Sequence, residues 1–578
     1  MRRRHFLKLC LSGTAIPLLV ACGVGQVPAG SVSAPTVSAS ATSATEPAAA
    51  QKTPKRGGTF IVAHDTDSIL GADTMKTTLS PTSAFTATLN GNGSFVRWAR
   101  EDLYKLEPGL AESWESDSTF TTWTFKIRDG VMWHDGTPFT AEDGAWWLNL
   151  AAFGTRSGDK IRPPAVWAPA LGQFDTISAT PDGQHVQVKM KSPAPFMLTA
   201  MGTPPNQMGH PRHLMQPMID QGNVNVAPED VNYVGTGPFK MSRYDKGSRI
   251  SVKRFDQYWE KDAQGEQLPY LDGIDFAIVP DPNAQDQAFV SGQLDIGSRA
   301  ADHVLTKDRR DQIVASLGDK VMFTNMDFSA SQIIFNTTLD SPFKDARVRQ
   351  AVMLWVDKSG FATVAGGLTF IPSLLGRNNP FTSPDFMTWP GFNQSTKDAD
   401  RARAKQLMAD AGYPNGFDTH MLQRDIEREI GVYIQGQLQG LGINVNLDIV
   451  DNAGWVQGGY ARKYILNNGS TSTALLPENT ESIFNVASKS PTGGGNSAHD
   501  DPKIDDFYQQ LHAASTDMEK RTQIWRAMER YWLVDQVYTV PLGGRLWVIP
   551  YRSYVQGLYP PPENQYHNTS FATVWLDK

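Results

Sequence analysis

The chain has two cysteines, Cys10 and Cys22, and both lie close to its N-terminus. Nearly all of its 578 residues must therefore fold without a disulfide, a cysteine-based metal site or a cysteine nucleophile. A chain of this length is expected to form two or three domains. With 15 Trp, 16 Tyr and 27 Phe, it has enough large apolar side chains to stabilise those domains by core packing alone.

The N-terminal segment combines two export signals. The pair Arg3-Arg4 begins a twin-arginine pattern, and Leu19–Cys22 forms a lipoprotein cleavage box. The apolar segment Leu9–Ala21 suits a signal sequence and is too short for a permanent transmembrane helix. We therefore expect residues 1–21 to be a twin-arginine lipoprotein signal peptide, with Cys22 lipidated and the protein anchored on the extracytoplasmic face of a bacterial cell membrane. The alternatives are a general export signal and an ordinary basic start beside an apolar segment.

A polar tether follows this signal. Ser31 to Gln51 consists mostly of Ser, Thr, Ala and Pro and carries one charge, at Glu46. Such a segment buries too little apolar surface to fold, so residues 22–56 are expected to be a disordered spacer. The signal has four basic residues and no acidic one, so its removal changes the formal net charge from −7 to −11. This balance argues against binding to nucleic acid or to an anionic lipid surface.

Beyond the tether, the apolar pattern changes between strand and helix spacing. A strand is expected at residues 57–63. Helical spacing predicts helices over Asp398–Ala411 and Ile430–Leu441, and alternation predicts a strand from Ile443 to Ile449. A helix that leads directly into such a strand indicates a crossover onto a sheet. Thr140 is expected to cap a helix that begins after it, and Thr516–Glu519 has the pattern of a capping box before a further helix.

Several of these segments, in this order, resemble motifs of the extracytoplasmic solute-binding proteins that serve peptide, nickel and oligosaccharide ABC importers. The longest, FKIRDGVMWHDGTPFTAED at Phe125–Asp143, is similar to the family pattern F-x-L-R-x-G-V-x-W-x-D-G-x-P-x-T-A-x-D. The other motifs are Glu107–Trp114, Gly235–Phe239, Tyr258–Trp259, Gly292–Ile296, Phe335–Thr337, Pro342–Phe343, Arg347–Ala351, Ala409–Tyr413 and Leu441–Ile443. The resemblance covers roughly residues 57 to 545.

The resemblance implies an α/β, bilobal periplasmic-binding-protein-like fold (type II, cluster C) with an extra subdomain inserted in the first lobe. The implied parts are lobe I at residues 57–95, 233–325 and 541–578, the inserted subdomain at residues 96–232, and lobe II at residues 326–540. The chain is expected to cross between the lobes near Gln332–Asn336 and again near Val540. A solute would lie in the cleft between the lobes and be buried when they close about this hinge.

In the peptide-binding branch of the family, a carboxylate in lobe II, in a segment similar to W-x-x-D, pairs with the α-amine of the ligand. The corresponding stretch here, Asn467–Ala474, has neither the Trp nor the Asp. A buried amine without a partner is costly, whereas hydroxyls and amides both donate and accept hydrogen bonds. This departure favours an oligosaccharide-like solute over a simple peptide, and it makes Asn468, Ser470 and Ser472 candidate ligand-binding residues.

Two alternatives to this site remain open. If the alignment is shifted across a loop, the missing acid is Glu478 or Glu481. In lobe I, the loop after the opening strand normally contacts the ligand in this family, and aromatic rings there offer stacking faces. The further candidates, for which a core role is the alternative, are Phe85, Asn92 and Trp98 from this loop and Trp355 from the helix after the hinge.

Other titratable residues receive structural interpretations. His134, in a turn, is interpreted as a satisfied surface group. Arg347 and Arg349 are expected to pair with nearby acids such as Asp345, with binding of an anionic solute as the alternative. His210–His213 has metal-like spacing, but it contains a proline and no clustered carboxylate, so we interpret it as a loop and assign no metal.

The resemblance implies a binding lipoprotein that captures a solute and delivers it to the permease subunits of an ABC importer, without a cofactor and as a monomer. A secreted hydrolase is the competing enzyme hypothesis, but the sequence has no nucleophile elbow and no H-E-x-x-H zinc motif. A sensor that uses the same fold without transport is the second alternative.

Overall fold

The computed structural model describes most of the chain from Thr53 to Lys578, and residues 54–578 form one compact unit. The described residues are 53–64, 67, 73–75, 83–91, 94–99, 105–165, 168, 172–195, 197–202, 208–297, 305–377, 379–472, 477–480, 498–514, 517–558 and 570–578. The predicted signal peptide, Cys22 and most of the tether lie outside them.

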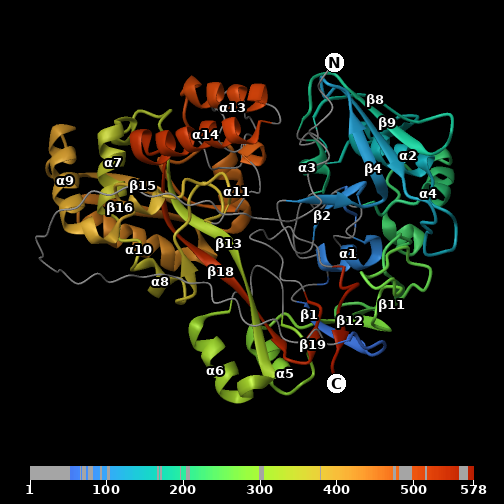
Figure 1. The fold of residues 1–578 in the computed structure, drawn as a ribbon. Helices are drawn as coiled ribbons and strands as arrows, with labels where there is room; N and C mark the ends of the chain where they lie inside the picture. Colours follow the sequence, from blue (N-terminus) through green and yellow to red (C-terminus); the bar gives the residue numbers. More distant parts are fainter. Residues whose placement is uncertain are drawn as a thin grey trace, which may run out of the picture. The chain divides into compact units, whose positions relative to one another are not determined.

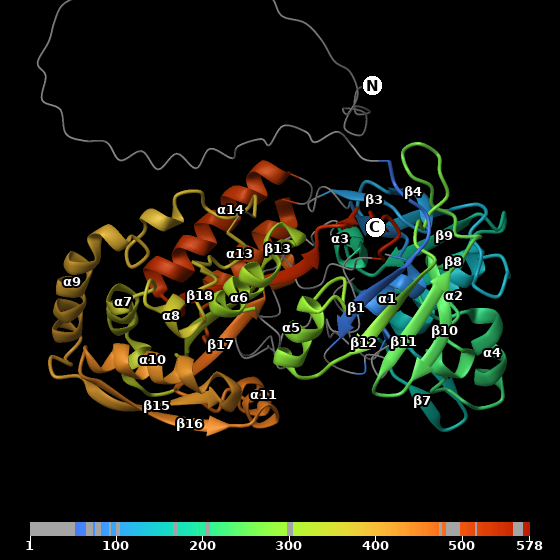
Figure 2. The ribbon, with the colours of Figure 1, turned by 90° about the horizontal axis from the view of Figure 1, so that it is seen from below.

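A four-stranded sheet contains the first strand of this unit (Figure 2). Its order is β1 (Thr59–His64), β12 (Gly273–Ile278), β11 (Arg249–Arg254) and β10 (Phe239–Asp245). β1 and β12 are parallel, and the other pairs are antiparallel. Helix α1 (Ser83–Asn90) packs against one face through a buried cluster that includes Phe60, Phe85 and Phe276. The opposite face packs against α5 (Pro282–Val290) and α6 (Lys307–Leu317).

A second sheet, antiparallel throughout, lies within residues 96–232, the range predicted for the inserted subdomain. Its strands, in order, are β4 (Ala111–Ser116), β5 (Thr122–Ile127), β9 (His185–Met190) and β8 (Phe174–Ala179). Helix α2 (Ala141–Phe153) packs on this sheet. Thr140 caps α2 as its sequence predicts, because its hydroxyl accepts a hydrogen bond from Asp143 N–H.

Smaller elements complete this part of the chain. They are hairpin β2 (Val96–Trp98) and β3 (Leu106–Pro108), hairpin β6 (Thr155–Ser157) and β7 (Lys160–Arg162), and helices α3 (Met197–Gly202) and α4 (Arg212–Asp220). Near the C-terminus, β19 (Val555–Gln556) pairs with β20 (Trp575–Leu576).

A six-stranded sheet forms the core of residues 321–552. Its order is β14 (Thr369–Phe370), β18 (Thr539–Arg552), β13 (Val321–Phe335), β17 (Leu466–Ser472), β15 (Phe417–Arg424) and β16 (Ile443–Val450). β15 and β16 are parallel and are joined through α10 (Arg428–Gln439), which confirms the predicted crossover. The other longer helices are α7 (Ala346–Trp355), α9 (Lys397–Asp410), α11 (Asn452–Tyr460), α13 (Pro502–Ala514) and α14 (Met518–Arg530).

The strands β13 and β18 are unusually long and lie side by side (Figure 1). At one end, Val321 and Val548 belong to the cluster that includes α5 and α6. At the other end, Ile333 and Val540 belong to a cluster formed with α7, α10 and α14. The pair therefore connects two separate hydrophobic cores, as a two-stranded hinge would. The predicted lobe boundaries stay predictions, and we use lobe I and lobe II for the two ranges defined above.

The predicted helix at 398–411 corresponds to α9, which ends at Asp410, and the helix at 430–441 corresponds to α10. The predicted capping box is displaced by one residue, because Asp517 caps α14 by accepting a hydrogen bond from Lys520 N–H. Within the described ranges, no helix combines the length and apolar character needed to cross a membrane.

Candidate functional site

The amide- and hydroxyl-rich stretch predicted to contact the solute forms strand β17. This strand lies between β13 and β15, beside one of the two connecting strands. Its backbone register pairs Asn468 with Ile333, Ser470 with Ser331 and Ser472 with Ser329. The polar end of β17 therefore runs along the part of β13 that passes between the two hydrophobic cores. The side chains of Ser470 and Ser472 lie outside the described residues.

Asn468 is fully buried and has one unsatisfied polar atom. Its Nδ2 donates to Gln423 Oε1 at 3.1 Å. Gln423 Nε2 in turn donates to the carbonyls of Arg424 and Glu427, so only its oxygen is available to Asn468. This fixes the amide orientation of Asn468 and leaves its Oδ1 without a hydrogen-bond donor among the described residues. A buried unsatisfied acceptor is costly, so Oδ1 is a candidate acceptor for a solute N–H or O–H group.

The preceding residue, Asn467, is tied to α11. Trp455 Nε1 donates to Asn467 Oδ1 at 2.9 Å and is 3.2 Å from the Asn468 carbonyl oxygen. The Arg424 guanidinium lies 5.2 Å from the centre of the Trp455 ring and pairs with Glu427 at 2.8 Å. Sequence reasoning did not select Trp455, Gln423 or Arg424, because their contacts with β17 depend on the strand order.

Trp98 is the predicted lobe I residue with the clearest relation to lobe II. It is 6% exposed and belongs to the buried cluster that contains Ile333 and Leu466, the β13 and β17 neighbours of Asn468. Its Nε1–H has no acceptor among the described residues. Trp98 Nε1–H is therefore an unsatisfied donor beside the core on which β17 packs, and Asn468 Oδ1 is an unsatisfied acceptor on β17 itself.

The neighbour of Trp98 in β2 anchors this strand. Arg97 donates to Glu107 at 2.8 Å and to Glu260 at 2.9 Å, and Tyr258 donates to the second oxygen of Glu260. Burial opposes the charge on Arg97, but the Glu260 carboxylate outweighs this effect and raises the pKa of Arg97 above its ordinary value. The guanidinium is therefore held as a cation inside lobe I.

The other predicted residues have the contacts of packing groups. Phe85 is fully buried, with edge-to-face contacts to Phe276 and Tyr233. Trp355 donates from Nε1 to the Gln437 carbonyl at 2.8 Å and lies against α9 and α10. Asn92 lies outside the described residues, as do Glu481 and the side chain of Glu478.

His134 and the two arginines are used structurally, with two corrections. His134 is buried rather than on the surface. Its buried ring is satisfied, because Nδ1 accepts a hydrogen bond from Gly235 N–H and Nε2 donates one to the Gly237 carbonyl. Arg347 pairs with Asp345 at 2.6 Å, as predicted. Arg349 instead donates to backbone carbonyls, including that of Phe343 at 2.7 Å, and burial lowers its pKa to about 10.

The His210–His213 stretch is a loop only as far as Pro211, because α4 begins at Arg212. Its two histidines pair with different acids: His210 lies 3.1 Å from Asp73, and His213 lies 2.7 Å from Asp135. Among the described residues, no group of three or more His, Cys, Asp or Glu side chains could hold a metal ion.

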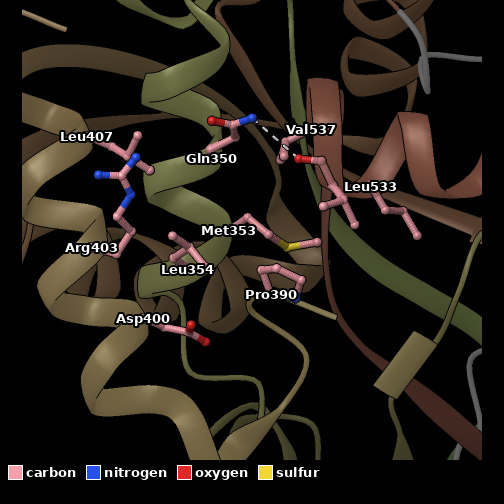
Figure 3. A pocket seen from close by; sticks show the side chains of 10 residues that line it. Gln350, Met353, Leu354, Pro390, Asp400, Arg403, Leu407, Leu533 and Val537 are labelled. Atoms are coloured by element: carbon pink, nitrogen blue, oxygen red, sulfur yellow. Dashed lines mark hydrogen bonds between the residues drawn. The ribbon is translucent and has the colours of Figure 1, made fainter. Parts of the chain in front are cut away.

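A mainly apolar cavity of about 340 Å³ lies elsewhere in lobe II (Figure 3). It is bounded by α7, α9 and the turn that follows α14, with Met353, Leu407 and Leu533 in its lining. Asp400 and Arg403 are its charged residues. None of the predicted ligand-binding residues lines this cavity, so it is separate from the polar strand β17.

Comparisons with known proteins agree with this architecture. A family model for bacterial extracellular solute-binding proteins, family 5 Middle, matches residues 105–492. By sequence, the chain is 23% identical over 454 residues to the glutathione-binding protein GsiB of Pectobacterium atrosepticum, covering 74% of this chain and 78% of the relative.

Two solved structures share the fold. The periplasmic binding protein DppA of Helicobacter pylori, in complex with the peptide STSA, matches with a TM-score of 0.68 and 19% identity over 91% of this chain and 99% of the other. AgaA of A. tumefaciens R10, in complex with agropinic acid, matches with a TM-score of 0.66 and 22% identity over 90% of this chain and 99% of the other. These matches confirm the predicted bilobal α/β fold class. Because the family model spans more than half of the sequence, the chain belongs to the bacterial extracellular solute-binding proteins of family 5.

Proposed function

We propose that this protein captures a small polar solute between lobe I and lobe II and delivers it to the membrane permease of an ABC importer. The observation that carries the proposal is the pair of unsatisfied polar atoms described above, Trp98 Nε1 from lobe I and Asn468 Oδ1 from lobe II. A solute that accepts one hydrogen bond and donates another satisfies both, and closure about β13 and β18 buries it.

The solute class that we propose is peptide- or oligosaccharide-like. The amides and hydroxyls of β17 suit a solute rich in donors and acceptors. The names of the relatives include binding proteins for glutathione and for peptides and a complex with agropinic acid, so the family fold accommodates small polar acids and peptides. The protein itself performs no chemistry in this proposal.

The location that we propose is the extracytoplasmic face of the cell membrane, with a lipid on Cys22 as the anchor. The export signals and the polar spacer support it, because a spacer after a lipidated cysteine holds the folded unit away from the bilayer.

The proposal is tested with residues 54–578, which form one compact unit. Melting temperatures are measured with a panel of tripeptides, glutathione and neutral and acidic oligosaccharides, and the affinity of each compound that raises them is measured by titration calorimetry. A solute that binds the folded state raises the melting temperature by mass action. If no member of the panel binds, the proposed function is contradicted.

Trp98→Phe then locates the site, because it keeps an aromatic ring and removes only the indole donor and part of the ring surface. Loss of one hydrogen bond predicts an affinity several-fold to about tenfold weaker. The matched control is Trp123→Phe, since Trp123 is also buried with an unsatisfied Nε1 but belongs to the inserted-subdomain core. Equal affinities for the two variants would remove Trp98 from the site.

A further inference from the structure

Arg545 lies at the junction of the two hydrophobic cores. Along β18, Trp547 and Ile549 belong to the lobe I cluster, and Leu546 and Val548 pack on the opposite face against α5 and α6. Because side chains alternate along a strand, Arg545 lies on the same face of β18 as Trp547 and Ile549, two residues nearer to the lobe II core.

The next residue on this face of β18, Gly543, packs against the lobe II core. A Cβ atom at Gly543 would lie 2.2 Å from Cδ1 of Phe361, a residue of the lobe II cluster. This face of β18 therefore packs against the lobe I core at Trp547 and against the lobe II core at Gly543. Arg545 is the residue between these two positions on the same face.

Arg545 has no partner in the described part of the chain. Its side chain is half-buried. Its Nε–H is shielded from solvent and has no hydrogen-bond acceptor or ion-pair partner among the described residues. Arg552, another arginine of the same strand, also has an unsatisfied Nε–H, but its terminal Nη2 donates to the carbonyls of Phe289 and Val290. A half-buried guanidinium with an unsatisfied N–H is unfavourable unless an acceptor reaches it.

The register brings Arg545 into line with the polar strand. Arg545 pairs with Ser329 of β13, which pairs with Ser472 of β17, and on its other side Arg545 pairs with Thr369 of β14. A single row across four strands therefore contains one cation and three hydroxyl-bearing residues. The row lies two residues along β17 from Ser470 and four from Asn468.

From this position we infer that Arg545 binds a carboxylate of the solute and makes the protein selective for acidic solutes. The inference rests on the proposed function and narrows it. A guanidinium donates two parallel hydrogen bonds to a carboxylate, which a neutral amide or hydroxyl cannot accept with the same strength. The carboxylate can come from the C-terminus of a peptide or from a sugar acid.

The test compares matched acidic and neutral probes on residues 54–578. One pair is a tripeptide with a free C-terminus and the same tripeptide as its C-terminal amide. The other pair is a galacturonic acid oligomer and the galactose oligomer of equal length. Affinities are measured by calorimetry for the wild type, Arg545→Gln, Arg545→Lys and the control Arg156→Gln, which removes an exposed arginine from hairpin β6–β7.

We expect the acid of one pair to bind the wild type about tenfold or more tightly than its neutral partner. Arg545→Gln should abolish this difference while leaving the affinity for the neutral partner unchanged, and Arg545→Lys should retain part of it. Which pair shows the effect identifies the source of the carboxylate. The melting temperature of unliganded Arg545→Gln should match the wild type, because no ion pair is lost.

Two outcomes separate the inference from the proposed function. If acid and neutral partners bind equally, or if Arg545→Gln keeps the preference for acid, the role of Arg545 is refuted while solute capture stands. If neither member of either pair binds the wild type, both the inference and the proposed function are refuted.

Discussion

At the scale of single residues, His134 illustrates how a motif that suggests chemistry can serve packing. The ring connects a turn of the inserted subdomain to the Gly235 and Gly237 backbone of lobe I. Since Nδ1 accepts a hydrogen bond, the proton of the neutral ring is on Nε2. Burial lowers the pKa of His134 to about 4, so the ring is neutral at physiological pH.

His134 therefore predicts a specific loss of stability in acid. Between its ordinary pKa of about 6.5 and its folded value, the unfolded chain binds a proton that the folded chain does not. The contribution of His134 to stability is present above pH 6.5 and declines as the pH falls to about 4, by at most about 3 kcal/mol. His134→Gln keeps a donor for Gly237 and removes the titration.

Unfolding free energies of the wild type and His134→Gln, measured by denaturant titration at several pH values between 7 and 4, check this prediction. The wild type should lose more stability than the variant across this range. Parallel pH profiles would show that the pKa of His134 is not lowered in the folded protein.

Sequence reasoning succeeded at this scale where contacts are local. Thr140 was identified as a cap because its partner is three residues away. It failed for Arg545, whose relation to β17 runs through two strand registers and across more than 70 residues of sequence. The signal that could have selected Arg545 is a cation directly after Gly543-Gly544, in the middle of a largely apolar strand.

At the scale of elements, strand β2 positions the lobe I part of the proposed site. Its three residues place Arg97 in a buried ionic network and Trp98 against the lobe II core. The Arg128 guanidinium also stacks on Trp259 at 4.3 Å, beside this network. Because buried charges are stable only when paired, the network fixes the strand in one position.

Removal of Arg97 should therefore be strongly destabilising. Arg97→Met leaves the carboxylates of Glu107 and Glu260 without their shared cation, and the expected cost is about 3–5 kcal/mol. The combined variant Arg97→Met, Glu260→Gln should recover part of this loss, because it also removes one buried charge. Thermal and denaturant unfolding measure both values.

The control is Arg243→Met, which breaks an exposed pair with Asp245. Surface pairs of this kind contribute little, so its cost should stay below about 1 kcal/mol. If Arg97→Met and Arg243→Met have equal effects, the network does not fix β2.

Elements were predicted well where the apolar pattern is strong. The helices predicted from spacing at 398–411 and 430–441 correspond to α9 and α10, and the strand predicted at 443–449 corresponds to β16. The strand β17 was recognised as a polar stretch but not as the neighbour of β13, because pairing order depends on contacts far apart in sequence.

At the scale of the whole molecule, the two long strands β13 and β18 connect two separately packed cores. Their pairing is interrupted by register shifts between Asp327 and Ser329 and between Ser331 and Gln332. Such irregularities bend a strand pair locally, and they lie where the strands leave one core and enter the other. This arrangement suits closure about a hinge, in which the contacts made only in the closed state provide the binding energy.

Hydrogen exchange measured by mass spectrometry tests whether one solute contacts both lobes at once. The probe is the compound of the panel with the largest effect on the melting temperature, at saturating concentration on residues 54–578. We predict slower exchange in both β2 and β17, with hairpin β6–β7 unchanged as the internal control. Protection confined to one lobe, or centred on the apolar cavity of α7 and α9, would contradict the account.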